Sequence, residues 1–178
     1  DEFLADAARN GCNASKLLQD RRDFQRFLAA QRKGMSRTDA SAAHLKMSLL
    51  LASTEQFRRV LAPALADVAP PKALLDVGAG RGEATASLAS ALGVPAKDVA
   101  IMEAAEQIRR KLSAERGFRA VASVEELRAD ERFGAVALLN VLDRCDDPLG
   151  LLGAAVQRLR PDGVLLVATV LPFCATVY

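Results

Sequence analysis

The chain has 178 residues, of which 51% are hydrophobic and 26% are charged, and its formal net charge is +2. This length and composition are typical of one globular domain with a sizeable core, and they exclude disordered and collagen-like chains. The small net charge argues against a nucleic-acid or anionic-membrane partner, and no run approaches the roughly 18–20 apolar residues of an integral membrane segment.

Helical periodicity dominates the first 70 residues. Apolar residues recur at helical spacing over Ser15–Lys33, and a second helical stretch covers roughly Ala40–Leu51. A third helix is expected to begin at Ser53 or Thr54, either of which can act as its N-cap, and Pro70–Pro71 ends it. We therefore expect a helical N-terminal extension over residues 1–70.

From residue 71 to 178, short apolar runs alternate with helical patterns. The expected strands are Ala73–Val77, Val99–Met102, Arg119–Ala122, Ala135–Leu139 and Val164–Val170. The expected helices are Glu83–Leu92, Ala104–Glu115 and Pro148–Leu159, and a turn at Pro161-Asp162-Gly163 is expected to return the chain to the sheet. Continuous apolar strands that alternate with helices predict an α/β fold, a doubly wound and mostly parallel sheet covered on both faces.

Three glycines at alternate positions follow the first expected strand: Gly78, Gly80 and Gly82. Glycine lets the backbone turn tightly there and approach a ligand that a Cβ would push away. Glu103 lies just beyond the second strand, where a doubly wound fold places a carboxylate that accepts hydrogen bonds from ribose hydroxyls. The alternative is a plain strand-to-helix turn, with Glu103 as a solvated helix start.

The run Asp76-Val77-Gly78-Ala79-Gly80-Arg81-Gly82 resembles the first motif of class I S-adenosylmethionine-dependent methyltransferases, which have a Rossmann-like fold. In that superfamily the loop passes under the amino-acid end of the cofactor, and the acid after the second strand grips its ribose. The resemblance implies S-adenosylmethionine as the cofactor, held by Asp76, Gly78, Gly80 and Glu103.

The segment from Asn140 to Pro148 reads Asn-Val-Leu-Asp-Arg-Cys-Asp-Asp-Pro, and Leu171-Pro172-Phe173 follows the fifth expected strand. Both are similar to segments of the DREV-type methyltransferase-like family of protein-histidine N-pros-methyltransferases. The resemblance implies methyl transfer to histidine side chains of protein or peptide substrates, with His-x-His motifs expected. It implies that Asn140 and Asp143 are catalytic, with Asn140 also at the cofactor.

Two features depart from that family. Its glycine motif usually has Asp where this chain has Arg81, and an acid there can help to hold the ammonium group of the cofactor. Its sheet closes with an antiparallel strand pair after the fifth strand, whereas this sequence ends at Tyr178, so we expect an incomplete methyltransferase core over 71–178 with an unpaired edge strand. A class I methyltransferase of small molecules and a non-catalytic cofactor-binding or partner-binding module therefore remain as alternatives.

The remaining candidates have plainer interpretations. Asp147 is expected to cap the helix that starts at Pro148, and Arg144 to pair with its acidic neighbours. His44 has no second His or Cys nearby and is expected at the surface or in helix packing. Cys145 is not expected to be a nucleophile, because methyl transfer from a sulfonium needs no covalent enzyme intermediate.

The three cysteines, Cys12, Cys145 and Cys174, are scattered along the chain without the spacing of metal ligands. Such a set favours a reducing intracellular compartment and predicts neither a disulfide framework nor a metal site. Position 1 is Asp rather than Met, so residues can precede it, and the localisation is not narrowed further. The sequence predicts no particular oligomeric state.

Overall fold

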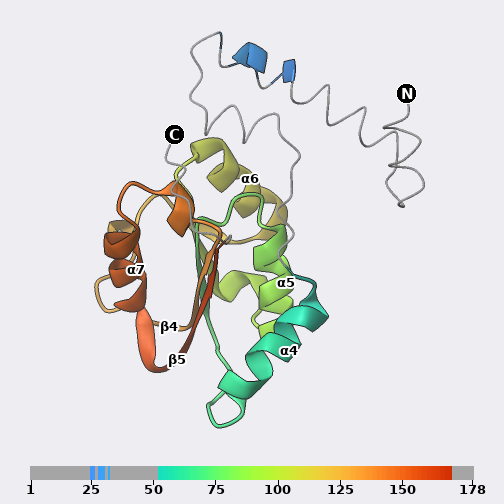
Figure 1. The fold of residues 1–178 in the computed structure, drawn as a ribbon, viewed down its shortest axis with the longest axis vertical. Coiled ribbons are helices and arrows are strands. Elements are labelled where there is room, and N and C mark those ends of the chain that lie inside the picture. The colour runs from blue at the N-terminus through green and yellow to red at the C-terminus, as the bar shows by residue number, and fades with distance from the viewer. Residues whose placement is uncertain (1–24, 27, 31, 33–51, 170–178) are drawn as a thin grey trace, which may run out of the picture. The chain divides into compact units, whose positions relative to one another are not determined.

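The computed structural model describes residues 25–26, 28–30, 32 and 52–169 (Figure 1). The chain divides into two compact units, Asp1–Ser48 and Leu49–Tyr178, and the fold below is that of the second. In the first unit the described residues are helical, within the helix expected over Ser15–Lys33. The helix expected over Ala40–Leu51 lies outside the described residues.

Helix α4 (Thr54–Leu65) begins at the N-cap Ser53, one of the two residues expected there. The hydroxyl of Ser53 accepts a hydrogen bond from the backbone N–H of Gln56, whose side chain accepts one from the backbone N–H of Ser53 at 2.8 Å. Phe57 and Leu61, one turn apart, are buried in the core that covers the sheet. Helix α4 thus packs in the same unit as the sheet, although it falls within residues 1–70, where a helical extension was expected. The division into two domains at residue 70 stays a prediction.

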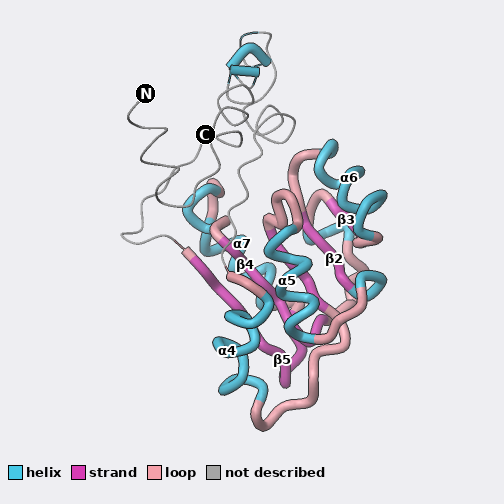
Figure 2. The backbone as a smooth tube through the Cα atoms, turned by 90° about the vertical axis from the view of Figure 1, so that its right-hand side faces the viewer, coloured by secondary structure: helices cyan, strands magenta, loops and turns pink. Residues whose placement is uncertain are grey.

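Five strands form one parallel sheet in the order β3-β2-β1-β4-β5 (Figure 2). They are β1 (Leu74–Val77), β2 (Val99–Met102), β3 (Arg119–Val121), β4 (Phe133–Leu139) and β5 (Leu159–Ala168). The connecting helices are α5 (Glu83–Leu92), α6 (Glu106–Arg116) and α7 (Pro148–Val156). This is the doubly wound α/β fold that the alternation of strands and helices predicted.

The two faces of the sheet are covered by different helices, α7 on one side and α4 and α5 on the other (Figure 1). Successive side chains of β1 point to opposite faces of the sheet. Leu74 packs in the hydrophobic cluster that contains residues of α4, α5 and α6, whereas Leu75 and Val77 pack in the cluster that contains residues of α7. Each of these buried side chains stabilises the fold by roughly 1.5–3 kcal/mol. The centre of the sheet is therefore apolar, and polar groups are left to the ends of its strands.

Strand β5 corrects one detail of the sequence analysis. Leu159 already pairs with Phe133 and Val164 with Ala135, so Pro161-Asp162-Gly163 forms an irregularity inside β5 instead of a turn before it. Pairing starts this early because the N–H of Phe133 donates to the carbonyl of Arg158 at 2.8 Å. Pro161 has no N–H for the ladder, so the extra residues bulge out.

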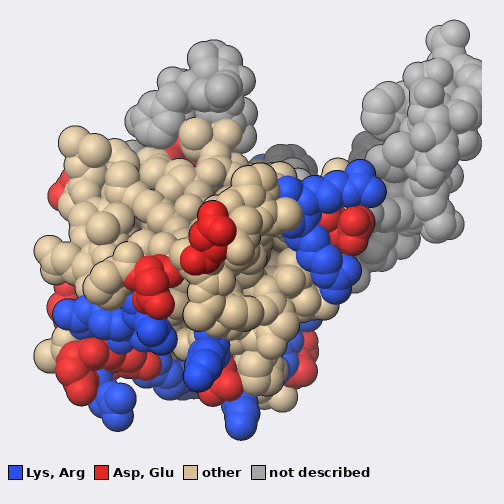
Figure 3. Space-filling view, turned by 90° about the horizontal axis from the view of Figure 1, so that it is seen from below, with Lys and Arg blue, Asp and Glu red and all other residues tan. Residues whose placement is uncertain are grey.

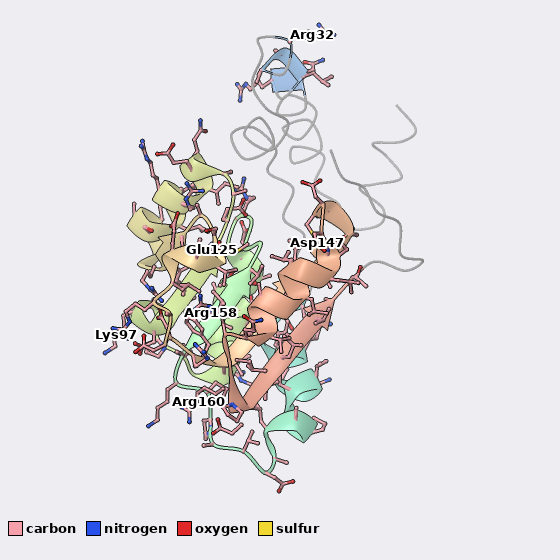
Figure 4. All side chains as sticks on the ribbon, turned by 90° about the vertical axis from the view of Figure 1, so that its left-hand side faces the viewer. Arg32, Lys97, Glu125, Asp147, Arg158 and Arg160 are labelled. Atoms are coloured by element: carbon pink, nitrogen blue, oxygen red, sulfur yellow. The ribbon has the colours of Figure 1, made fainter. Side chains whose placement is uncertain are left out.

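Arg158 joins the end of α7 to the segment that follows β3. Its guanidinium donates to the carbonyl oxygens of Arg128 at 2.6 Å and Val124 at 3.0 Å. Figure 4 shows Arg158 and Asp147 at opposite ends of α7. The same two carbonyl oxygens also accept backbone hydrogen bonds, from Glu131 and Leu127 respectively, so the guanidinium ties the end of α7 to a segment that is already folded.

Charged side chains of both signs lie close together on the face in Figure 3, with broad areas that carry neither. Elsewhere on the surface, exposed ion pairs one helical turn apart include Glu106 with Arg110 on α6. Such pairs contribute about 0–1 kcal/mol each. Among residues 52–169 and the described part of the first unit, no helix is long and apolar enough to cross a membrane.

Candidate functional site

The buried polar and charged side chains of the described residues gather at the carboxyl end of the sheet. They are Asp76, Thr85, Glu103 and Asp143. Asp76 is near the end of β1, Glu103 follows β2, and Asp143 lies in the 3₁₀ helix Leu142–Arg144 that follows β4. Three buried acids face no buried Lys or Arg in the part of the chain that is described. Each acid has a polar partner nearby: the Thr85 hydroxyl for Asp76, backbone N–H groups for Glu103, and the Arg144 guanidinium for Asp143.

The three glycines of the glycine loop, Gly78–Gly82, do not have the same surroundings. All three have positive φ angles, between +51° and +76°. A Cβ on Gly78 would lie 2.6 Å from Val141 Cγ2, and one on Gly82 would lie 2.6 Å from Leu112 Cδ2. A Cβ on Gly80 would meet no described atom within 4 Å. Gly80 is therefore the glycine whose missing side chain leaves space next to the loop.

Glu103 is held from both sides by backbone groups. Its Oε2 accepts from the N–H of Gly80 at 2.9 Å and its Oε1 from the N–H of Ala105 at 3.1 Å. Its own N–H donates to the carbonyl of Val121 at 3.1 Å. The side chain is only 9% exposed, so Glu103 is not the solvated helix start of the alternative interpretation. Each carboxylate oxygen keeps a lone pair for a further donor such as a hydroxyl.

Asp76 lies beneath the glycine loop and is 1% exposed. Its Oδ2 accepts a hydrogen bond from the hydroxyl of Thr85, while Oδ1 has no hydrogen-bond partner among the described residues. Burial raises the pKa of Asp76 from 3.8 to about 7, against the lowering effect of the Thr85 hydroxyl and with a smaller raising effect from Glu103. Thr85 was not among the predicted site residues. The sequence signal for it is a hydroxyl in the first turn of an Ala-rich helix directly after the glycine loop.

We expect Asp76→Asn to stabilise the protein in a pH-dependent way. Because the folded pKa of Asp76 is raised, the ionised carboxylate costs folding free energy above pH 7, and that cost disappears below the unfolded pKa. The gain in unfolding free energy over the parent should rise from below about 1 kcal/mol at pH 4 to about 3–4 kcal/mol at pH 8. Urea unfolding at both pH values measures it, with the exposed Asp130→Asn as control; a gain that does not change with pH would contradict the buried-carboxylate assignment.

The loop after β4 starts with a residue in an unusual conformation. Asn140 has φ +55° and is the one residue other than glycine with positive φ in the described chain. Its N–H donates to the carbonyl of Ala168 at 2.8 Å. Asparagine tolerates the left-handed region better than most residues, and strained backbone is concentrated at functional sites.

Asp143 and the residues after it occupy the same loop. Asp143 is 5% exposed, and its Oδ2 lies 3.6 Å from Nε of Arg144. Asp147 caps α7, because its Oδ1 accepts from the N–H of Gly150 at 2.8 Å. The capping by Asp147 and the pairing of Arg144 were both predicted. Burial raises the pKa of the Cys145 thiol, so Cys145 does not have the depressed pKa that a reactive thiolate requires.

Two substitutions of Asn140 separate its backbone role from its side-chain role. Asn140→Ala forces a left-handed conformation on a residue with a Cβ, so it should lower the unfolding free energy by about 1 kcal/mol more than Asn140→Gly. If the Asn140 amide also contacts a bound cofactor, as the family resemblance implies, both variants should lose activity to a similar extent. Denaturant midpoints and turnover, measured in parallel, test the two roles; equal midpoints would show that the positive φ carries no strain.

The structure brings together most of the residues that the sequence singled out. The glycine loop bonds to β2 through Gly78 N–H and Met102 O at 2.8 Å, Glu103 bonds to Gly80, and Val141 contacts Gly78. Leu171-Pro172-Phe173 and His44 lie outside the described residues. In residues 52–169 and the short described stretch before them, no three His, Cys, Asp or Glu side chains are grouped to hold a metal ion.

Comparison with known proteins gives a family and a fold. A sequence model of the DREV methyltransferase family matches residues 14–178. Among solved structures, the sugar N-methyltransferase KedS8 from Streptoalloteichus sp ATCC 53650 is 25% identical with a TM-score of 0.51, over 68% of this chain and 49% of that chain. SAM-bound CalS10, an amino pentose methyltransferase from Micromonospora echinaspora, is 21% identical with a TM-score of 0.52, over 81% of this chain and 56% of that chain.

A third solved structure has a higher TM-score. The plantazolicin methyltransferase BpumL, in complex with a monoazolic desmethylPZN analog and SAH, is 11% identical with a TM-score of 0.60, over 82% of this chain and 58% of that chain. This chain therefore spans about half the length of the solved structures that it matches. The matches place the fold among those of methyltransferases.

Proposed function

This chain belongs to the DREV methyltransferase family, and from that premise we propose that it transfers the methyl group of S-adenosylmethionine to histidine side chains of protein substrates. The acceptor is the ring nitrogen nearer to the backbone, in His-x-His motifs. The observation that carries the proposal is the Asp143 carboxylate, buried in the loop after β4 whose residue Val141 contacts the glycine loop.

The cofactor is S-adenosylmethionine, and the residues at the carboxyl end of the sheet fit it. Gly80 leaves room for a ligand against its backbone, and Glu103 has lone pairs left for two ribose hydroxyls. The buried acids Glu103 and Asp143 add negative charge at this edge, which suits the positive charge of a sulfonium. When bound, this cofactor supplies a methyl group on a positively charged sulfur, ready for direct displacement.

Asp143 selects the nitrogen that reacts. A neutral imidazole has one N–H and one lone pair, and only the nitrogen with the lone pair can attack a methyl group. The Asp143 carboxylate accepts a hydrogen bond from the distant N–H and so keeps the lone pair on the nitrogen nearer to the backbone. It also stabilises the positive charge that develops on the ring as the new bond forms. Asn140, at the end of β4, steers the acceptor and the cofactor.

A small molecule with an amino group is the second candidate acceptor. Two of the matched structures favour it, because KedS8 is a sugar N-methyltransferase and CalS10 an amino pentose methyltransferase. The Asn140–Pro148 segment favours the histidine acceptor, since it is similar to the corresponding segment of protein-histidine methyltransferases.

Titration and transfer assays with the full-length protein test the proposal. Calorimetric titration with S-adenosylmethionine should show binding. If no binding is seen, both methyltransferase interpretations are excluded and a partner-binding module remains. Labelled methyl groups should then pass to a peptide with a His-x-His motif and not to the same peptide with Ala-x-Ala. Transfer to an amino sugar alone would replace the histidine acceptor with the small-molecule one.

A further inference from the structure

The glycine loop and the loop after β4 meet at Gly78 and Val141. The position that a Cβ of Gly78 would take lies 2.6 Å from Cγ2 and 2.8 Å from Cβ of Val141. The isopropyl group of Val141 thus lies against the backbone of the glycine loop. Any other residue than glycine at position 78 would push the two loops apart.

The conformation of Asn140 explains why Val141 reaches that point. Strands β1 and β4 are neighbours, with Val77 opposite Leu138, so both loops leave the sheet side by side. The left-handed Asn140 turns the chain after β4, and Val141 follows directly. Valine is stiff about χ1, which makes its side chain a spacer of defined shape. The carbonyl of Val141 also accepts from the N–H of Arg144 at 3.0 Å, which closes the turn that contains Asp143.

Each loop has its own hydrogen bonds, which do not depend on this contact. The glycine loop is bonded to Met102 through Gly78 and to Glu103 through Gly80. The loop after β4 is bonded to Ala168 through Asn140. Truncating Val141 should therefore leave both loops folded, but the loop after β4 loses a packing contact, so it should open more often and shift relative to the glycine loop.

We propose that Val141 is a positioning residue, which sets the acceptor-holding loop of Asp143 at the correct distance from the cofactor-holding glycine loop. This inference rests on the proposed function and extends it to a residue whose side chain lies against the glycine loop. Direct displacement requires nucleophile, methyl carbon and sulfur to be aligned, and a shift of about 1 Å can cost on the order of 10² in rate. The side chain of Val141 contributes shape only, so a residue of the same shape should replace it.

Three variants of the full-length protein test the proposal with the His-x-His peptide. Val141→Ala should lower kcat by about tenfold or more, with the KM for the peptide and the Kd for S-adenosylmethionine changed less than about twofold. Val141→Thr keeps the branched shape and should retain kcat within about threefold. Val60→Ala, the same truncation at a 64%-exposed site on α4, is the matched control and should behave like the parent.

Hydrogen exchange gives a readout that does not depend on turnover. In Val141→Ala the amides of residues 141–144 should exchange faster, while those of the glycine loop should not change. An unchanged kcat, or a loss of cofactor affinity as large as the loss of kcat, would overturn the positioning role. If the parent protein methylates no histidine peptide, the proposed function fails. The role of the Val141 side chain in holding its loop is tested separately, because unchanged protection of residues 141–144 in Val141→Ala would contradict it.

Discussion

Asp143→Asn is expected to lower methyl transfer to a His-x-His peptide by about 10²-fold or more. The substitution keeps the shape of the side chain and removes the charge that holds the proton on the distant ring nitrogen. It also removes the carboxylate that stabilises the charged ring in the transition state. Cofactor affinity should barely change, because the glycine loop and Glu103 are held by their own hydrogen bonds. Single-turnover rates at saturating cofactor, together with calorimetric titration, measure both quantities.

The neighbouring Asp146 provides a matched control for this experiment. It lies three residues further along the same loop and is exposed, so Asp146→Asn changes the net charge of the loop by the same amount. We expect Asp146→Asn to keep turnover close to that of the parent. Near-normal turnover in Asp143→Asn, or equal losses in the two variants, would remove Asp143 from the mechanism.

Gly80→Val is expected to abolish measurable binding of S-adenosylmethionine. A Cβ at this position would meet no described protein atom within 4 Å, so we expect the valine side chain to extend into the space that we assign to the cofactor. The φ of +51° adds strain of about 1–2 kcal/mol for a residue with a Cβ, which lowers stability without removing the core. Calorimetric titration measures the binding, and urea unfolding measures the stability.

Gly93→Val separates the two effects. Gly93 ends α5 with φ +71° and, like Gly80, has open space where a Cβ would be. The same substitution there should cost similar stability and leave cofactor binding intact. Unchanged binding in Gly80→Val, or an equal loss of binding in Gly93→Val, would contradict the assignment of the glycine loop.

The fold could be predicted from the sequence because its elements carry local signals. Helix α5 has the predicted bounds Glu83–Leu92, set between Gly82 and Gly93, and β2 has the predicted bounds Val99–Met102. The bulge in β5 could not be predicted, because it depends on the pairing of Leu159 with Phe133 across the sheet. A Pro-Asp-Gly sequence by itself favours a turn, and only strand pairing shows that the strand begins before it.

The places of some candidate site residues could be predicted from the sequence, while their roles toward a cofactor stay predictions. The positions of Gly80 and Glu103 follow from the strand, loop and helix order, and the structure joins them by a hydrogen bond. Thr85 and Val141 were not found, because their importance comes from contacts with Asp76 and Gly78 that no local pattern encodes. The roles of Asn140 and Asp143 in catalysis stay predictions, which their burial and conformation support.

The identity of the methylated ring nitrogen tests the account most directly. After reaction of the full-length protein with S-adenosylmethionine and a His-x-His peptide, the product is hydrolysed and the two methylhistidine isomers are separated and identified by mass spectrometry. If the Asp143 carboxylate accepts a hydrogen bond from the distant N–H, the methyl group should be found on the nitrogen nearer to the backbone. Methylation of the distant nitrogen, or of no histidine at all in the presence of bound cofactor, would contradict the account.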